Sequence, residues 1–207
     1  MATAKTLHEE LVPAQGAAIW VRRLALMAIG VAALWLSAKI QIATQPVPIT
    51  LQVLVVMTIG AAYGSRLGVA TLLTYLALGA AGEPVFAGTP EKGIGIAYML
   101  GATGGYLVGF VLAAGVTGWL AERGWDRNPV TMAAAMAAGL FALYVPGVLW
   151  LCGGFTLLPF DGAFQGYGWE NWYEYGVKTF LWIDALKLAV AVVAFPLVWR
   201  LVGGTRL

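Results

Sequence analysis

The sequence is poor in charge and in the residues that most often carry catalysis or bind metals. Only 11% of its 207 residues are charged, whereas soluble domains typically carry about a quarter. The net charge of +2 is too small to indicate nucleic-acid binding. The single cysteine, Cys152, excludes an internal disulfide and a cysteine metal cluster, and the single histidine, His8, excludes bis-histidine haem ligation. We therefore expect no metal site and no cofactor.

A phosphate-binding G-x-x-x-x-G-K-[ST] motif is also missing. If the chain performs active transport, a partner or an ion gradient must supply the energy. Hydrophobic residues, in contrast, make up 60% of the chain and form several long runs. These runs indicate an all-α integral membrane protein that crosses the lipid bilayer several times.

Six transmembrane helices are expected within a single domain, residues 20–207, behind a polar cytoplasmic tail, residues 1–19. Arg22 and Arg23 precede the first apolar run as in a signal peptide, but the run is long enough to span and no cleavage site follows it. The expected helices are 20–40, 50–63, 67–81, 103–121, 130–151 and 174–201.

The first of these helices carries a ridge of small residues, Ala28 and Ala32, with Gly30 close by. Small residues let helices approach closely in lipid, where burying apolar surface gives no advantage over lipid contact. The ridge predicts either packing against another helix of this chain or docking to a separate membrane subunit.

Three connecting segments stand out. Pro46 and Pro48 favour an extended loop at 43–50, and residues 82–100 form a long glycine-rich loop. Residues 153–173 are rich in aromatics and predict either a short interfacial helix or a lid. Glycines at 104 and 105 open the fourth helix, with Thr103 as its expected N-cap, and would let a ligand approach the backbone. Pro146 predicts a kink in the fifth helix.

The distribution of lysine and arginine predicts the orientation. One side of the membrane would hold eight basic residues: Lys5, Arg22, Arg23, Arg66, Arg123, Arg127, Arg200 and Arg206. The other would hold three: Lys39, Lys92 and Lys178. Both termini are therefore expected in the cytoplasm, with the three distinctive loops together on the outer face.

The last helix carries two opposite charges, Asp184 and Lys187, which share a face because they lie three residues apart. Charges inside a bilayer are costly and usually face a bundle interior or a polar cavity. The pair is either a silent ion pair or part of a ligand site below the outer loops. As a site, it would suit a neutral or mixed polar head group, because Lys187 would oppose a cation and Asp184 an anion. Further contacts are expected from Gln52, Phe86, Tyr98, Tyr106 and Tyr144.

Four motifs together resemble one known family. They are VPITLQ at 47–52, G-x-PVFAG at 82–88, TGGY at 103–106 and D-x-x-K at 184–187. In this combination the chain is similar, from about residue 20 to 200, to BioY, the biotin-specific substrate-capture (S) component of energy-coupling factor (ECF) transporters. Ala102 stands where the family usually has proline, and the segment 89–93 is less glycine-rich than usual.

The resemblance implies a six-helix S-component fold in the bacterial cell membrane. It implies biotin capture at the outer face and, as partners, a transmembrane coupling subunit and ATPase subunits, with self-association left open. Asp184 would accept a ureido N–H of biotin, while Lys187 would donate to the ureido carbonyl or orient Asp184. The remaining implied contacts are Gln52, Thr103 and Tyr106 for polar groups, Phe86 and Tyr144 for the rings, and Gly104 with Gly105 for the tail. Ala28 and Ala32 would dock on the coupling subunit.

Three other hypotheses stay open at this point. The chain could be an S component for another vitamin, or a structural membrane subunit without a ligand. It could also be a membrane-embedded enzyme that uses Asp184 as acid or base, but it lacks a nucleophile–base pair, a metal set and a cofactor motif.

Overall fold

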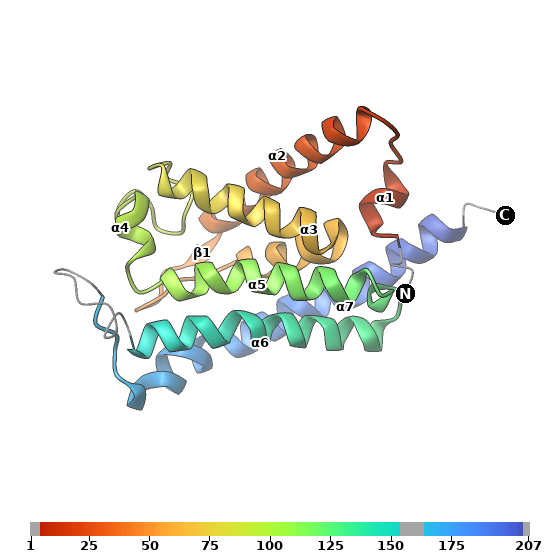
Figure 1. Ribbon diagram of the computed structural model, residues 1–207. Coiled ribbons are helices and arrows are strands. Elements are labelled where there is room, and N and C mark those ends of the chain that lie inside the picture. The colour runs from red at the N-terminus through yellow and green to blue at the C-terminus, as the bar shows by residue number, and fades with distance from the viewer. Residues whose placement is uncertain (1–4, 154–163, 205–207) are drawn as a thin grey trace.

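The structure, a computed structural model, describes residues 5–153 and 164–204 and is mostly helical within them (Figure 1). Its α-helices are α1 (Leu7–Leu11), α2 (Ala18–Lys39), α3 (Gln52–Ala80), α4 (Gly95–Met99), α5 (Gly104–Ala121), α6 (Pro129–Gly153) and α7 (Thr179–Gly204). Shorter elements are β1 (Gln41–Ile42), β2 (Ile49–Thr50), the 3-10 turns η1 (Trp125–Arg127) and η2 (Trp169–Asn171), and the π turn η3 (Glu174–Lys178).

Helix α3 is a hairpin of two helical arms rather than one straight helix. Gly64 has φ 79° and ψ 173°, a left-handed conformation that glycine adopts without steric cost. A Cβ atom added at Gly68 would lie only 3.3 Å from the Cα atom of Gly60. The side-chain amide of Gln52 donates to the hydroxyl of Tyr75 at 2.9 Å. Residues 23 apart in one straight helix would be about 35 Å apart. The arms 52–63 and 65–80 therefore run back along each other, as the predicted turn at 64–66 requires.

Five helices of the described chain are long and apolar enough to cross a membrane: α2, α3, α5, α6 and the helix that includes η3 and α7. This agrees with the predicted all-α membrane protein. The predicted C-terminal ends of the fifth and sixth helices, 151 and 201, lie within three residues of the observed ends of α6 and α7. Helix α6 continues through Pro146, where the sequence predicted a kink.

Helix α5 forms the centre of the bundle, between α3 and α6 (Figure 1). Its glycines allow this close packing. A side chain at Gly109 would meet the Leu143 backbone of α6 at 2.4 Å, and one at Gly118 would meet the Ser65 backbone of α3 at 2.5 Å. Small residues thus let the backbones approach, which is how helices associate where lipid competes for apolar surface.

The loop with two prolines contains a short antiparallel pair of strands, which the all-α prediction missed. Gln41 lies opposite Thr50 and Ile42 opposite Ile49, and the hairpin between them includes Pro46 and Pro48. Two residues per strand are too few to give a periodic sequence signal. This β-hairpin, residues 41–50, leads from α2 directly into the first arm of α3.

The N-terminal tail is partly folded, in contrast to the polar tail that was expected. Residues 7–11 form α1, and Leu7 and His8 are buried against the hairpin bend of α3. Thr6 and Glu9 form a capping box, and the His8 ring lies 3.2 Å from the Ala62 carbonyl. Burial lowers the pKa of His8, so the ring is held neutral.

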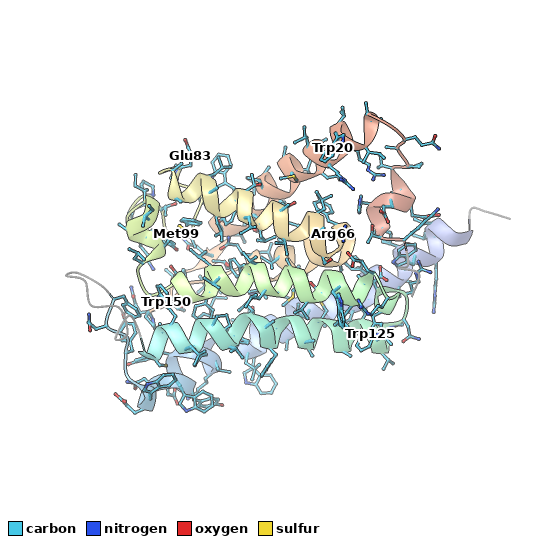
Figure 2. All side chains as sticks on the ribbon, in the orientation of Figure 1. Trp20, Arg66, Glu83, Met99, Trp125 and Trp150 are labelled. Atoms are coloured by element: carbon cyan, nitrogen blue, oxygen red, sulfur yellow. The ribbon has the colours of Figure 1, made fainter. Side chains whose placement is uncertain are left out.

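The bundle has two distinct ends. Figure 2 places Trp20, Arg66 and Trp125 toward the end where α1 lies, and Glu83, Met99 and Trp150 toward the end where α4 lies. The β-hairpin and the loop 82–94 gather at the α4 end (Figure 1). The loops rich in proline and glycine thus meet at one end.

Candidate ligand-binding site

Asp184 and Lys187 form a buried ion pair on the inner side of α7. Lys187 Nζ lies 2.7 Å from Asp184 Oδ1, and their side chains are 12% and 3% exposed. The other carboxylate oxygen, Oδ2, accepts a hydrogen bond of 2.9 Å from the Tyr144 hydroxyl on α6. Both oxygens are therefore satisfied, as a buried charge requires.

Lys187 also contacts the β-hairpin. Its ammonium donates to the backbone carbonyl of Thr50 at 2.6 Å. A charge-assisted bond to a carbonyl is stronger than a neutral one. The last residue of β2 is thus held against α7 by the charged end of Lys187.

A cavity of about 40 Å³ lies beside this pair. It is lined by Asp184 and Lys187 from α7, by Tyr106 from α5, by Tyr144 from α6, and by the hairpin residues 47–50. Phe180 and Leu143 add apolar wall. A polar pair on one side and aromatic rings on the others suit a small molecule with a polar head and an apolar body.

A second cavity of about 40 Å³ adjoins the first. Val47, Pro48, Thr50, Tyr106 and Phe110 line both cavities. The second adds Gln52, Ala87, Tyr98 and Thr103. The two cavities therefore bring together seven of the ten predicted ligand-binding residues: Asp184, Lys187, Gln52, Tyr98, Thr103, Tyr106 and Tyr144.

Together these cavities are much smaller than the roughly 300–1,000 Å³ of typical ligand pockets. Asp184 and Lys187 line only the first space and Gln52 only the second, and the hairpin contributes Val47, Pro48 and Thr50 to both. A ligand that contacts both sets of residues therefore needs more room than the two cavities provide.

Gln52 belongs to a chain of hydrogen bonds that reaches the loop 82–94. Its amide donates to the Tyr75 hydroxyl at 2.9 Å, and that hydroxyl donates to the Val85 carbonyl at 2.8 Å. Tyr98 on α4 donates to the Ala87 carbonyl at 2.8 Å, and burial raises the pKa of Tyr98, which keeps its hydroxyl protonated. The loop is thus anchored beside the second cavity.

Phe86 lies outside both cavities, where the prediction made it a ligand contact. Its ring stacks on Tyr98 with centroids 5.0 Å apart and meets Tyr75 edge-on at 5.5 Å. It also fills the space that a side chain at Gly79 would occupy, with a closest approach of 2.0 Å. Phe86 is 1% exposed and anchors its own loop against Tyr75 of α3 and Tyr98 of α4.

Gly104 and Gly105, which the resemblance placed near the ligand tail, pack closely against neighbouring segments. A side chain at Gly104 would meet the Met99 carbonyl at 2.1 Å, and one at Gly105 would meet Trp150 at 2.3 Å. These glycines let α6 pack against the start of α5, and neither lines the two cavities. Thr103 holds the N-cap position of α5 but makes no side-chain capping bond, and it lines the second cavity with Tyr98.

Tyr106 lines both cavities, but its hydroxyl is already engaged. It donates to the Gly176 carbonyl of η3 at 2.8 Å. Its ring lies 5.9 Å from that of Phe180 and 6.5 Å from that of Tyr144. Tyr106 therefore offers a ligand its aromatic face and joins α5 to the start of α7.

A larger cavity, of about 530 Å³, lies at the opposite end of the bundle. It is a wedge between α1, α2 and α3, and its walls include Trp20, Arg23, Tyr63, Arg66 and Glu122. None of the predicted ligand-binding residues reaches it. Volume alone would favour this wedge, but the buried ion pair and its convergent polar groups favour the smaller cavities.

Ala28 and Ala32 lie on the exposed side of α2, away from the rest of the bundle. Only 11% of the α2 span is buried, against 67% of the α5 span. Large apolar side chains flank the two alanines, among them Leu24 and Ile29, which are 64% and 61% exposed. Of the two alternatives for the small ridge, packing within this chain is therefore excluded for these two residues.

Two residues that the sequence reading passed over support the site. Tyr75 lies in an apolar helical run and Lys39 was counted only as a charge, yet both bind the loop 82–94. Neither shows a local signal, because each acts on backbone carbonyls that are distant in sequence. Residues 154–163 of the predicted lid or interfacial helix at 153–173 lie outside the described residues; of the remainder, residues 169–171 form a 3-10 turn.

Residues 5–204 match the family model described as the BioY family. The chain is 35% identical over 184 residues to a probable biotin transporter BioY of Pyrococcus horikoshii, covering 89% of this chain and 98% of that one. It is 36% identical over 171 residues to the biotin transporter BioY of Thermotoga maritima, covering 83% and 92%.

A crystal structure of the S-component for biotin from an ECF-type ABC transporter has the same fold. The TM-score is 0.69 at 24% sequence identity, over 91% of this chain and 94% of that one. The S-component fold that the sequence resemblance predicted is thereby confirmed.

Proposed function

We propose, since the chain belongs to the BioY family, that it captures biotin at the outer face of the cell membrane and delivers it into the cell. In this function it is the substrate-specificity component of an ECF-type transporter and not an enzyme. The buried Asp184–Lys187 pair beside two aromatic-walled cavities is the observation that carries the proposal.

The pair suits the ureido ring of biotin, which has adjacent N–H donors and one carbonyl. An ionised carboxylate only accepts hydrogen bonds and an ammonium only donates them. Asp184 would accept a hydrogen bond from a ureido N–H. This bond would either replace the one from the Tyr144 hydroxyl or add to it. Lys187 would donate to the ureido oxygen and keep Asp184 in place.

The contact between Lys187 and the Thr50 carbonyl supports this assignment. A backbone amide carbonyl thus accepts from the ammonium to which a ureido carbonyl would bond. Binding would exchange one carbonyl for another at the same ammonium, so Lys187 keeps an acceptor throughout. The β-hairpin, released from Lys187, would move outward and join the two cavities.

The other predicted contacts follow from the same placement. Gln52 and Thr103 would provide polar groups in the second cavity, and Tyr106 and Tyr144 would pack on the bicyclic ring. Phe86 would act through the loop backbone that it supports. Gly104 and Gly105 would shape the start of α5 rather than contact the tail of the ligand.

Ligand analogues test the head-group assignment directly. Dethiobiotin keeps the ureido ring and should compete with biotin, whereas the diamine that lacks the ureido carbonyl should bind at least tenfold more weakly, since a buried donor loses its acceptor. Thermal-shift measurements on the purified chain should include other vitamins. Tight binding of another vitamin, without binding of biotin, would refute the proposed specificity.

The orientation proposed for the chain follows the positive-inside rule. Arg22, Arg23, Arg66, Arg123 and Arg127 lie in or beside the segments at the α1 end, and Lys39 and Lys92 at the α4 end. We assign the α1 end to the cytoplasm and the α4 end, with the two cavities, to the outside of a bacterial inner membrane. Both termini would then be cytoplasmic.

The proposed partners are a transmembrane coupling subunit and ATPase subunits. The exposed alanines of α2 support a docking face there, because a partner helix can approach closely at small residues. Whether copies of the chain also associate with one another is a separate question that co-purification would answer.

A further inference from the structure

Lys39, the last residue of α2, holds a loop distant in sequence by its backbone. Its ammonium lies 2.8 Å from the Pro84 carbonyl, 3.1 Å from that of Phe86 and 2.9 Å from that of Thr89. The Thr89 hydroxyl oxygen lies at 3.1 Å as a fourth acceptor. An ammonium has three N–H donors, so Lys39 uses its full capacity on one short stretch of chain.

The stretch 84–89 has almost no regular secondary structure to satisfy its carbonyls. Side chains from three different helices do so instead: Lys39 from α2, Tyr75 from α3 and Tyr98 from α4. The two tyrosines bond one carbonyl each, whereas Lys39 bonds three. Of these three anchors, Lys39 makes the most contacts and is the only charged one.

Lys39 also adjoins the β-hairpin. The next residue, Ile40, accepts a hydrogen bond from the Leu51 amide at 3.1 Å, which closes the base of the hairpin 41–50. The hairpin provides Val47, Pro48 and Thr50 to the second cavity, and the loop provides Ala87. Lys39 thus connects the loop, through its side chain, with the hairpin, through the adjoining backbone. Both segments line the second cavity.

We propose that Lys39 is a positioning residue for the ligand: it locks the loop 84–89 to the base of the hairpin 41–50, and the lock slows the escape of bound biotin. This inference rests on the proposed function. Lys39 lines neither cavity, so it acts through the two segments and not by touching the ligand.

The alternative is that Lys39 only stabilises the fold. The two roles differ in what they predict for kinetics. A purely structural lysine would lower the melting temperature of the ligand-free chain and leave the dissociation rate of the folded fraction unchanged. A positioning lysine would change the dissociation rate of protein that is folded, because the segments covering the ligand separate more often.

The test is the biotin dissociation rate of the purified full chain with Lys39→Met, which keeps the length of the side chain and removes its donors. Loss of bonds from a charged donor should raise the rate about tenfold. Lys39→Arg keeps a charge and donors and should recover part of the slow release. Thr89→Val removes one of the four acceptors and should give a smaller increase.

Lys92→Met is the matched control. Lys92 lies on the same loop and is exposed, so this substitution removes the same charge without removing any of these carbonyl contacts. It should release biotin at the wild-type rate. The inference is overturned if Lys39→Met also releases at the wild-type rate, or if Lys92→Met accelerates release equally. Failure of the wild-type chain to bind biotin would instead refute the proposed function.

Discussion

Helices α7 and α2 both cross the bundle, yet they present opposite faces to their surroundings. Helix α7 turns a charged pair inward, and its Asp184 is only 2% exposed. Helix α2 turns small and apolar residues outward, including Ala28 and Ala32. If α7 recognises the ligand and α2 docks on a partner, as we propose, each activity can be removed while the other persists.

The largest effect is expected from Asp184→Asn. Removing one member of a buried, hydrogen-bonded charge pair typically costs about 2–5 kcal/mol of binding, so biotin affinity should fall at least tenfold. Lys187 would keep the Thr50 carbonyl but lose its carboxylate. Isothermal titration of the purified variant measures the loss, and size-exclusion chromatography checks that the variant remains folded.

An exposed ion pair on the adjoining turn is the control for this substitution. Glu174 and Lys178 lie 2.8 Å apart with side chains 56% and 54% exposed, and such surface pairs contribute little. Glu174→Gln should leave biotin affinity unchanged. Wild-type affinity in Asp184→Asn would show that the buried pair is a silent feature of packing.

The converse effect is expected on α2. Ala28→Trp or Ala32→Trp should leave biotin affinity within about twofold of wild type, because neither residue lines the site, yet reduce uptake in cells at least tenfold by blocking close helix approach. Ala137 is exposed on α6, so Ala137→Trp provides a matched small-to-large change elsewhere. Normal uptake and normal co-purification of partners by the α2 variants would remove the docking role of this face.

A smaller effect is expected from Tyr144→Phe. This change removes only the hydroxyl that donates to Asp184 at 2.9 Å and keeps the ring in the cavity wall. Loss of one hydrogen bond to a charged group should weaken biotin binding about three- to tenfold. Tyr173→Phe, at an exposed position, should have no effect when measured in the same titration. A Tyr144→Phe variant as weak as Asp184→Asn would assign the main contact to the hydroxyl instead.

The smallest effect concerns α1, at the end of the bundle far from the site. Burial lowers the pKa of His8 below its ordinary value of 6.5, so the folded chain favours the neutral ring. The contribution of His8 to stability is therefore full above about pH 6.5 and declines as the pH falls through the lowered folded pKa. The wild type should lose more melting temperature between pH 8 and pH 5 than His8→Gln does.

Biotin affinity should be the same in His8→Gln and in the wild type at neutral pH. This outcome would sharpen the comparison, because α1 packs against α3 and α7 but lines neither of the two small cavities. Equal loss of melting temperature in both proteins would show that the pKa of His8 is the same in the folded and the unfolded chain.

The membrane character, the helix hairpin around Gly64 and the charged pair were predictable because they depend on local composition and on residues three apart. The pair could be recognised in the sequence because a charged residue within an apolar membrane segment is energetically costly and therefore rare. Gln52, Tyr106 and Tyr144, which the sequence also singled out, line the two cavities, and their contact with a ligand stays a prediction.

The roles of Phe86, Gly104 and Gly105 were not predictable, because each is decided by a partner far away in sequence. Phe86 fills the space above Gly79, and the two glycines make room for α6. Lys39 escaped notice for the same reason, since its acceptors lie 45 to 50 residues away. Tertiary contacts of this kind leave no period or spacing in the sequence.

The most direct test of the central claim is an experimental structure of the chain with biotin bound. We predict the ureido ring between Asp184 and Lys187, with the Lys187 ammonium released from the Thr50 carbonyl and bonded to the ureido oxygen, and with residues 47–50 displaced outward. Biotin found in the wedge lined by Arg23 and Arg66, with the contact between Lys187 and Thr50 intact, would contradict it.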